Sequence, residues 1–497
     1  MIRSVRFGCS VCLASLWLGS PAAFAAEPAE ARDPEALLAE GDRLADEAAY
    51  GEAVLRYKLA YDQIVPRLRG LKFKRTVEAR LMDRSELKDS LVDLIEEEMP
   101  AADMMLLDRS LKAFGFVPAS LSAEATMIQL LTEEVGGYYD PKTKKITLIS
   151  EANEPQSRGL IDLFLGPRPA FSKEEQRAAL AHEMAHALAD QHFDLEALHE
   201  AVKDDDDLEL ALSALIEGEA MIVMIAEMLR ETGDPQAALR MPPGYIDMSF
   251  TLVKGFLPFM AGKAFRRAPA IFRESLTFPY FKGMVFVLHL TNRGRWDAVN
   301  DAFRHPPLST EQILHPEKFY ATVDVPVEIG LPSVSDLVAR DWKKLGENVL
   351  GEFQTAVLLR RHRGRTAAAG WDGDRYAVFE GSDERLGLVW YSTWDTVRDA
   401  QELATAYARY RLAKLGHGAN EDTVMPEESS PSASDQAITF RIRVDGRDYA
   451  VRRRGPDVAV VEGFSPAETD AILSRLSDVT KTPKRFPSLK TTHDKGG

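Results

Sequence analysis

The most constraining feature of this sequence is an apolar stretch, residues 178–189, that is interrupted by two histidines and a glutamate. It reads Ala178-Ala-Leu-Ala-His182-Glu183-Met-Ala-His186-Ala-Leu-Ala. Apolar residues occur on every side of the corresponding helix, which predicts a buried helix. Two imidazoles and a carboxylate are costly to bury unless they bind something. Because residues four apart share a helix face, His182 and His186 can hold one metal ion.

The H-E-x-x-H spacing also places a base beside that metal. Glu183 lies one residue around the helix from His182, where it can accept a proton from a water and pass it to a leaving amine. A zinc ion would lower the pKa of that water and polarise the scissile carbonyl. These residues therefore predict Zn²⁺ as the cofactor and peptide-bond hydrolysis as the reaction, with Glu183 as general base.

The positions of the two cysteines limit which residue types can complete the metal site. Both lie within residues 1–25, which combine early arginines, an apolar run over 7–18 and the cleavage pattern Ala23-Phe24-Ala25. This composition is typical of a secretory signal peptide and predicts a periplasmic or secreted protein; an uncleaved anchor is the alternative. The rest of the chain has no cysteine. Its metal ligands must therefore be His, Asp or Glu.

The charge balance excludes some partners. The chain has 61 lysines and arginines against 77 aspartates and glutamates, a formal net charge of −16. This argues against a nucleic-acid-binding protein and disfavours adhesion to anionic membranes. Beyond the signal peptide, no stretch reaches the roughly 18 apolar residues of a membrane-spanning helix. We therefore expect no stable membrane insertion after cleavage.

A third ligand is needed, and Glu217 is the strongest candidate. It lies in Ala211-Leu-Ser-Ala-Leu-Ile-Glu217-Gly-Glu219-Ala-Met, a second apolar helix in which a lone carboxylate should be a ligand or a paired group. Glu219 is about 200° around the helix from Glu217. Only one of the two carboxylates can therefore face the metal.

His192 is the competing third ligand, because it follows His182 at the spacing of metzincin peptidases. Those enzymes have a glycine at the position of Ala189, and alanine is a strong helix former. If the helix continues, His192 points away from the metal. Asp190, four residues after His186, is a candidate to orient that imidazole.

Taken together, these motifs resemble zincin metallopeptidases of the gluzincin type, whose third ligand is a glutamate on a following helix. The residues at 182–194 and 216–220 also resemble those of a poorly characterised group of bacterial exported proteins. That group shares counterparts of Gly137-Tyr-Tyr-Asp-Pro141, Phe278-Pro-Tyr280-Phe-Lys-Gly283 and the run 307–316. The resemblance covers roughly residues 70–415. Many gluzincins have a carboxylate where this chain has Met221, so the surroundings of the ligands differ.

The resemblance also implies groups that bind the substrate and stabilise the transition state. Zincins bind substrate along a sheet edge upstream of the metal helix, and the strand-turn-strand pattern at 137–149 is placed for that role. A donor to the developing oxyanion is also needed. His315, Tyr280 and Tyr139 qualify by type, and we take His315 and Tyr280 as the candidates.

The remaining patterns predict an α-rich α+β protein with several regions. A helical region at 26–125 contains one helix pair that resembles the tetratricopeptide type, and a plain helical hairpin is the favoured alternative because no second copy follows at a 34-residue period. This helix pair is a candidate binding site for a protein partner. A zincin-like core is expected at 126–330. Strand-strand-helix modules are expected at 331–415 and 436–480, joined by a Glu/Ser/Pro-rich linker at 416–435, and the two runs can be halves of one module. Residues 481–497 are expected to be a disordered tail.

Two readings compete with that of a peptidase acting on a peptide or protein substrate. One is a zinc-binding adaptor of the cell envelope that has lost catalysis, and the other is a metal-free scaffold. Glu183 argues against loss of catalysis, because a site without catalysis does not need a general base.

Overall fold

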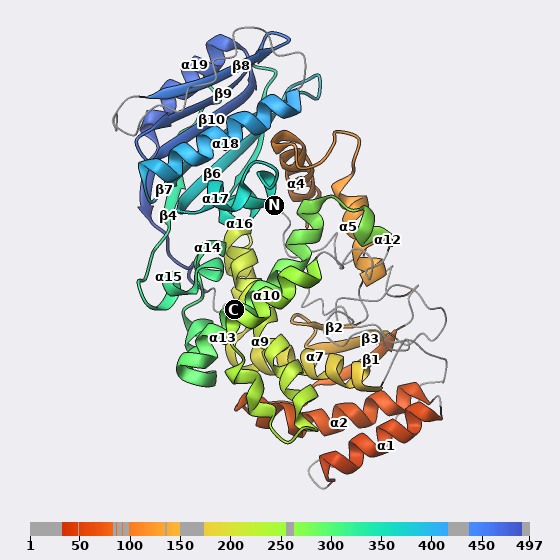
Figure 1. Ribbon diagram of the computed structural model, residues 1–497. Helices are drawn as coiled ribbons and strands as arrows, with labels where there is room; N and C mark the ends of the chain where they lie inside the picture. Colours follow the sequence, from red (N-terminus) through yellow and green to blue (C-terminus); the bar gives the residue numbers. More distant parts are fainter. Residues whose placement is uncertain are drawn as a thin grey trace, which may run out of the picture.

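The structure is a computed structural model that describes residues 32–47, 49–82, 86, 92, 99–134, 137–149, 173–254, 263–415 and 437–489. The expected signal peptide and the expected linker at 416–435 lie outside these ranges. The described chain is a mixed α+β protein in which helices predominate (Figure 1). None of its helices is long and apolar enough to cross a bilayer.

The helices fall into two groups along the chain. Those before residue 321 are α1 (Pro34–Asp46), α2 (Tyr50–Arg69), α4 (Ala101–Phe114), α5 (Ala123–Glu134), α7 (Lys173–Phe193), α8 (Leu195–Val202), α9 (Asp206–Arg230), η2 (Pro235–Arg240), α10 (Pro243–Lys254), α12 (Lys263–Arg267), α13 (Ala270–Arg304), α14 (Thr310–Leu314) and α15 (Pro316–Tyr320). Those after it are α16 (Gly351–Leu358), α17 (Gly364–Ala368), α18 (Val397–Leu415), α19 (Pro466–Arg475) and η4 (Leu476–Asp478).

The strands of the described chain form three sheets. The first has the order β1-β3-β2 and contains β1 (Glu78–Met82), β2 (Gly137–Asp140) and β3 (Lys145–Ile149). The second has the order β5-β6-β7-β10-β9-β8 and contains β5 (Lys343–Asn348), β6 (Trp371–Glu380), β7 (Leu386–Trp394), β8 (Ile438–Val444), β9 (Arg447–Arg454) and β10 (Asp457–Phe464). The third pairs β11 (Thr480–Pro483) with β4 (Val327–Gly330).

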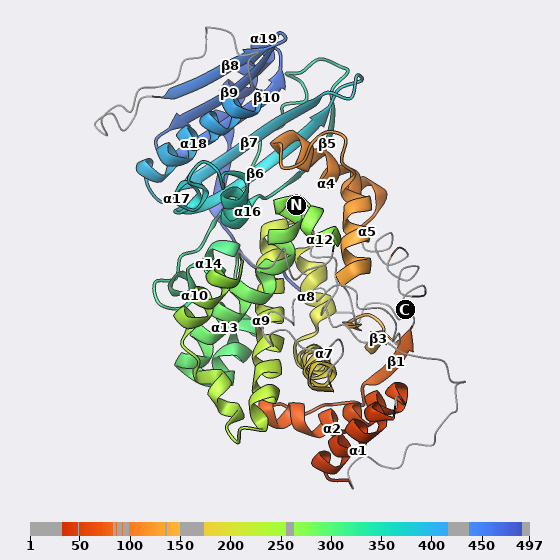
Figure 2. The ribbon, with the colours of Figure 1, turned by 45° about the vertical axis from the view of Figure 1, so that its right-hand side comes forward.

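Three long helices make the centre of the molecule. The two longest, α9 and α13, pack along each other, and α7 lies against α9 (Figure 2). Gly218 of α9 and Gly283 of α13 meet where the helices cross, and a Cβ atom at either position would overlap backbone atoms of the other helix. The helix axes can therefore come close only because both residues are glycine. This crossing lies next to Glu217.

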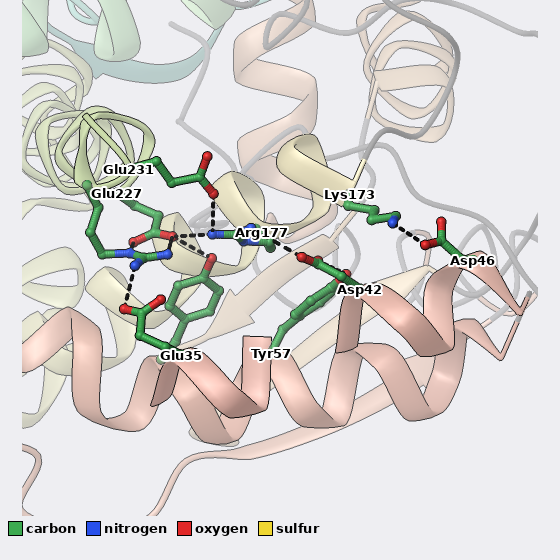
Figure 3. Close-up of polar contacts among 10 residues, drawn as sticks. Glu35, Asp42, Asp46, Tyr57, Lys173, Arg177, Glu227 and Glu231 are labelled. Carbon is green, nitrogen blue, oxygen red and sulfur yellow. Dashed lines mark hydrogen bonds and ion pairs between the residues drawn. The ribbon is translucent and has the colours of Figure 1, made fainter. Parts of the chain in front are cut away.

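The N-terminal hairpin α1–α2 is attached to this centre by its inner face. Tyr57 and Tyr61 of α2 are fully buried, and the Tyr61 hydroxyl donates to Glu227 of α9 at 3.0 Å. Arg177 of α7 lies between Asp42 of α1 at 3.7 Å and Glu227 at 3.4 Å (Figure 3). The helix pair is thus packed against the two helices that carry the candidate metal ligands.

The hairpin is followed by a strand that the sequence pattern did not predict. Residues 26–125 were expected to be helical, yet β1 pairs in parallel with β3, with Ala79 opposite Ile146. The expectation of an all-helical region is wrong at this point. The strand forms because a partner strand nearly 70 residues later is available, and local propensity carries no information about that partner.

The strands of the two expected C-terminal modules, β5–β7 and β8–β10, form one six-stranded sheet rather than two separate units. Its central strands β7 and β10 pair antiparallel, and each comes from a different one of the two predicted runs. Helices α18 and α19 cover opposite faces of the sheet (Figure 1). Trp390 packs against Tyr407 of α18, whereas Val389 belongs to the apolar cluster that contains Ile472 of α19. The strand-strand-helix pattern predicted two strands within 436–480, and the structure has three. The strand that was not predicted, β10, lies at the centre of the sheet.

The chain after this sheet is placed as far as Leu489. Residues 480–483 form β11, and Lys484 is buried, with its ammonium 2.7 Å from Asp205 at the start of α9. The disordered tail expected from Lys481 is therefore wrong for residues 481–489. An intramolecular strand partner and a buried ion pair hold a segment whose composition predicted disorder.

Candidate metal centre

The two histidines of the H-E-x-x-H motif lie on one face of α7 and point at the same place. His182 and His186 are buried, as the apolar surroundings predicted. Their Nε2 atoms are 3.0 Å apart. Helix α7 continues without a break from Lys173 to Phe193. The i, i+4 spacing has therefore brought both imidazoles to one point.

Glu217 of α9 completes the group. Its Oε2 atom lies 3.2 Å from Nε2 of His182 and 3.5 Å from Nε2 of His186. Ligand atoms about 2.0–2.1 Å from a tetrahedral zinc ion lie about 3.3 Å from one another. The three observed separations fit three corners of such a tetrahedron. Two imidazoles and one carboxylate with the fourth corner open are a donor set typical of catalytic zinc.

The protonation states of Glu217 and His182 suit a metal. Burial would raise the pKa of Glu217, but the imidazoles of His186 and His182 outweigh it and lower the pKa to about 2. Burial lowers the pKa of His182, which favours the neutral imidazole. For His186, burial also lowers the pKa, but the carboxylates of Glu217, Glu183 and Glu219 outweigh burial and raise it. Zinc binds carboxylates and neutral imidazoles, so a metal that binds here must displace a proton from His186 whenever that ring is charged.

Glu183 is buried next to this group and contacts the first sheet. Its Oε2 atom accepts a hydrogen bond from the backbone N–H of Tyr139 at 2.8 Å. Tyr139 lies in β2, which in the described part of the chain is an edge strand, because the sheet has the order β1-β3-β2. The hairpin at 137–149 therefore lies against the motif helix, and its edge strand is the one next to Glu183.

Asp190 has a different partner from the one expected. Its Oδ2 atom accepts the hydroxyl hydrogen of Tyr139 at 2.7 Å, and its Oδ1 atom lies 3.1 Å from the ammonium of Lys144. Asp190 thus anchors the β2–β3 hairpin on α7 instead of orienting His186. The sequence could not show this, because the two partners are 51 residues apart.

His192 and Glu219 both face away from the group. The ring Nε2 of His192 lies 2.8 Å from the backbone carbonyl of Lys72. His192 could reach the metal only if the helix bent sharply near Ala189, as the metzincin alternative requires. Helix α7 is continuous through Ala189. Glu219 is fully buried and forms an ion pair with Arg69 of α2, a partner that the sequence analysis did not identify. Of the carboxylates of Glu217 and Glu219, only that of Glu217 lies with the two histidines, as expected from their positions around the helix.

The two oxyanion candidates lie in different places. The Tyr280 ring stacks on the His182 ring, with centroids 6.3 Å apart, so the structure brings Tyr280 to the metal group. His315 instead has its Nε2 atom 3.0 Å from Glu352 of α16. Within the described ranges, His315 is not part of the group formed by the three ligands.

A second acidic group in the described chain already holds a cation. Carboxylate atoms of Glu311, Asp324 and Asp395 lie within 4.8 Å of one another. The ammonium of Lys318 is 2.6 Å from Glu311 and 2.8 Å from each of the other two. A lysine therefore occupies the place that a metal would take, and this group is an ion-pair network.

Comparison with known proteins gives one match. Residues 339–473 match the model of a domain of unknown function, DUF8575. The matched region contains all six strands of the six-stranded sheet, α16–α18 and most of α19, and it lies outside the metal centre. No curated protein and no solved structure matches the chain.

Proposed function

We propose that this protein is an exported zinc metallopeptidase with a zincin-like core of the gluzincin type. The single observation that carries the proposal is the convergence of His182, His186 and Glu217 at tetrahedral spacing, with Glu183 beside them. The motif on α7 supplies two donors and a base, and α9 supplies the third donor. The proposal that the protein is exported rests on the composition of residues 1–25.

The roles of the residues follow from their positions. Zinc, when bound, supplies the Lewis acidity that activates water and polarises a carbonyl. Glu183 would take the proton of the attacking water and deliver it to the amine of the leaving peptide. The backbone N–H of Tyr139 holds one carboxylate oxygen of Glu183, which fixes the direction of the base.

The other substrate contacts are proposed from their proximity to this group. The edge strand β2 would pair with an extended peptide. Tyr280, stacked on His182, is better placed than His315 to donate to the oxyanion, because Tyr280 lies at the metal group, whereas His315 lies against Glu352 and is not part of the group within the described ranges. The N-terminal hairpin, whose Leu55 is exposed, remains a proposed site for a protein partner.

The first prediction tests the base. A Glu183→Gln variant keeps the size of the side chain and an acceptor for the Tyr139 N–H, so its zinc content after metal loading should equal that of the wild type. Cleavage of a broad peptide library should fall by about 10²–10⁴-fold, the usual contribution of a general base. Elemental analysis and mass spectrometry of the products measure both.

The outcomes separate the alternatives. Full zinc occupancy without any peptide cleavage by the wild type would favour the non-catalytic adaptor. Less than about a third of an equivalent of zinc would contradict the metal site itself. Equal cleavage by the variant and the wild type would show that Glu183 is not the base.

A further inference from the structure

The turn between α16 and α17 carries a dense positive charge. Four of the six residues at 360–365 are arginines, and the side chains of all four are exposed: Arg360, Arg361, Arg363 and Arg365. We call this segment the arginine turn. It lies within the region that matches the domain of unknown function. It plays no part in the metal centre.

Within the described residues, these arginines have no counter-charges. In the described part of the chain, no carboxylate pairs with any of the four guanidinium groups, and no side-chain hydrogen bond joins them to a neighbour. Some exposed arginines elsewhere do have such partners; Arg43, for example, lies 2.9 Å from Glu47, and Arg398 lies 3.1 Å from Glu402. Other exposed arginines also have no carboxylate partner in the described chain, but they lie at separate places along it: Arg67, Arg267 and Arg340. The property that distinguishes the turn is therefore the density of its unpaired charges.

The fold adds a fifth cation to the same place. The ring of His362 lies 6.0 Å from that of Tyr410, which packs the turn against the last part of α18. Lys414, in the last turn of that helix, is exposed. Its ammonium lies 5.9 Å from the centroid of the same Tyr410 ring, so the turn and Lys414 meet at that side chain. Partial burial and the nearby charges of Arg411, Arg361 and Arg360 lower the pKa of Lys414. Like charges held this close repel each other, and an anion that binds there would remove that cost.

The surroundings of the arginine turn indicate which anion it suits. The exposed large apolar residues of the described chain are all elsewhere: Leu55, Tyr245, Met248, Val323, Val325 and Leu489. A protein interface normally has an apolar or aromatic centre, which this patch does not have. A basic patch can bind the anionic headgroups of a bilayer through charge, without an apolar centre. Clusters of about four to eight basic residues are typical of proteins that bind anionic lipids.

We propose that the arginine turn, together with Lys414, binds the surface of an anionic phospholipid bilayer. The net charge of −16 opposes such binding for the molecule as a whole, so the contact is confined to this end of α18. Binding of this kind is peripheral and sensitive to salt, because the cations are exposed and screened. It would hold the C-terminal sheet at a membrane without any inserted helix.

The test is co-sedimentation of the full chain with vesicles. Vesicles of phosphatidylcholine alone are compared with vesicles that also contain phosphatidylglycerol, at low salt and at about 1 M salt, where the Debye length falls to about 3 Å. The wild type should bind the anionic vesicles at low salt and be released at high salt. One variant replaces the four arginines together: Arg360→Gln, Arg361→Gln, Arg363→Gln and Arg365→Gln.

That variant should bind at least tenfold more weakly, since each basic residue near an anionic surface strengthens binding by about fivefold. A matched control loses the same four charges at exposed, ion-paired arginines: Arg43→Gln, Arg240→Gln, Arg304→Gln and Arg398→Gln. The control should stay within about twofold of the wild type. Equal thermal melting of both variants shows that each is folded.

Three results would overturn the proposal. The wild type could fail to bind anionic vesicles at low salt. The control could lose as much binding as the turn variant, which would make net charge the cause. The wild type could bind duplex DNA or polyglutamate more tightly than the vesicles, which would make the partner a different class of macromolecule.

Discussion

At the scale of single residues, the metal centre depends on which of several similar side chains faces inward. Glu217 and Glu219 are two residues apart on one helix but have different partners. Glu217 lies beside the imidazoles, and Glu219 forms an ion pair with Arg69. His186 and His192 share another helix, but the His192 ring binds the backbone carbonyl of Lys72. The direction of each side chain around its helix axis therefore decides its role.

The second prediction compares the two possible third ligands. Glu217→Ala removes one of three donors and should weaken zinc binding by more than the roughly 10–100-fold loss typical of a residue that only supports a ligand. His192→Ala removes a contact with Lys72 and should leave zinc affinity within a few-fold. Zinc titration against a competing chelator measures both. A larger loss for His192→Ala would move the site to the metzincin arrangement.

At the scale of elements, the site is held by the contact between α9 and α13. Gly218 and Gly283 let the two backbones touch next to Glu217, and Tyr280 lies one turn before Gly283 on α13. The metal group thus contains no residue from a flexible surface loop. Its geometry depends on packed helices, which resist small displacements.

The third prediction concerns this crossing. Gly218→Ala places a methyl group where the backbone of Gly283 lies, so the helices must separate and Glu217 must shift. We expect a loss of about 1–3 kcal/mol in the free energy of unfolding, as for other overpacked cores, together with weaker zinc binding. Chemical denaturation and zinc titration measure the two effects.

Gly244→Ala is the matched control for this prediction. Gly244 is exposed on α10, and no atom lies within 4 Å of the place that an alanine methyl group would take, so alanine there should be neutral or slightly stabilising. Unchanged stability and zinc affinity in Gly218→Ala would show that the crossing is not tight.

At the scale of the whole molecule, the start of α9 joins the helical centre to the C-terminal sheet. Asp207 is buried there and accepts hydrogen bonds from the backbone and hydroxyl of Thr310. Lys484 of the C-terminal segment pairs with Asp205, two residues before Asp207. The helix that carries Glu217 is thus connected through its first turn to the segments that follow residue 305.

The fourth prediction is a pH dependence of stability at this junction. Burial raises the pKa of Asp207 to about 7, with Asp205 and Asp374 adding to the rise and Lys484 and Thr310 opposing it. A carboxyl whose pKa is raised by folding stabilises the protein while protonated, and this contribution is lost as pH rises from about 4 to about 7. The melting temperature of the wild type should therefore fall relative to that of Asp207→Asn over this range.

Thermal melts of both proteins at several pH values measure this difference. Asp297→Asn, at an exposed position on α13, is the control and should show the same difference from wild type at every pH. A constant difference between wild type and Asp207→Asn across the range would mean that Asp207 stays ionised in the folded protein.

Much of the candidate site was predictable from the sequence. The spacing of His182 and His186, the apolar residues around them and the carboxylate at Glu217 are local patterns, and the structure brings these three side chains together. Helix geometry explains this success, because a period of 3.6 residues determines which neighbours share a face. The α+β class and the hairpin at 137–149 follow from equally local periodicities.

The remaining features required the tertiary structure, because they join residues far apart in the chain. The contacts of Tyr139 with Glu183 and Asp190, the contact of His315 with Glu352 and the pairing of β1 with β3 have no local signal. The arginine turn is visible in the sequence, but only the fold shows that the turn and Lys414 both lie against Tyr410. Local periodicity determined which face of each helix is buried. Packing between distant segments decided what each face contacts, since the free energy of such contacts depends on shape and charge brought together by the whole fold.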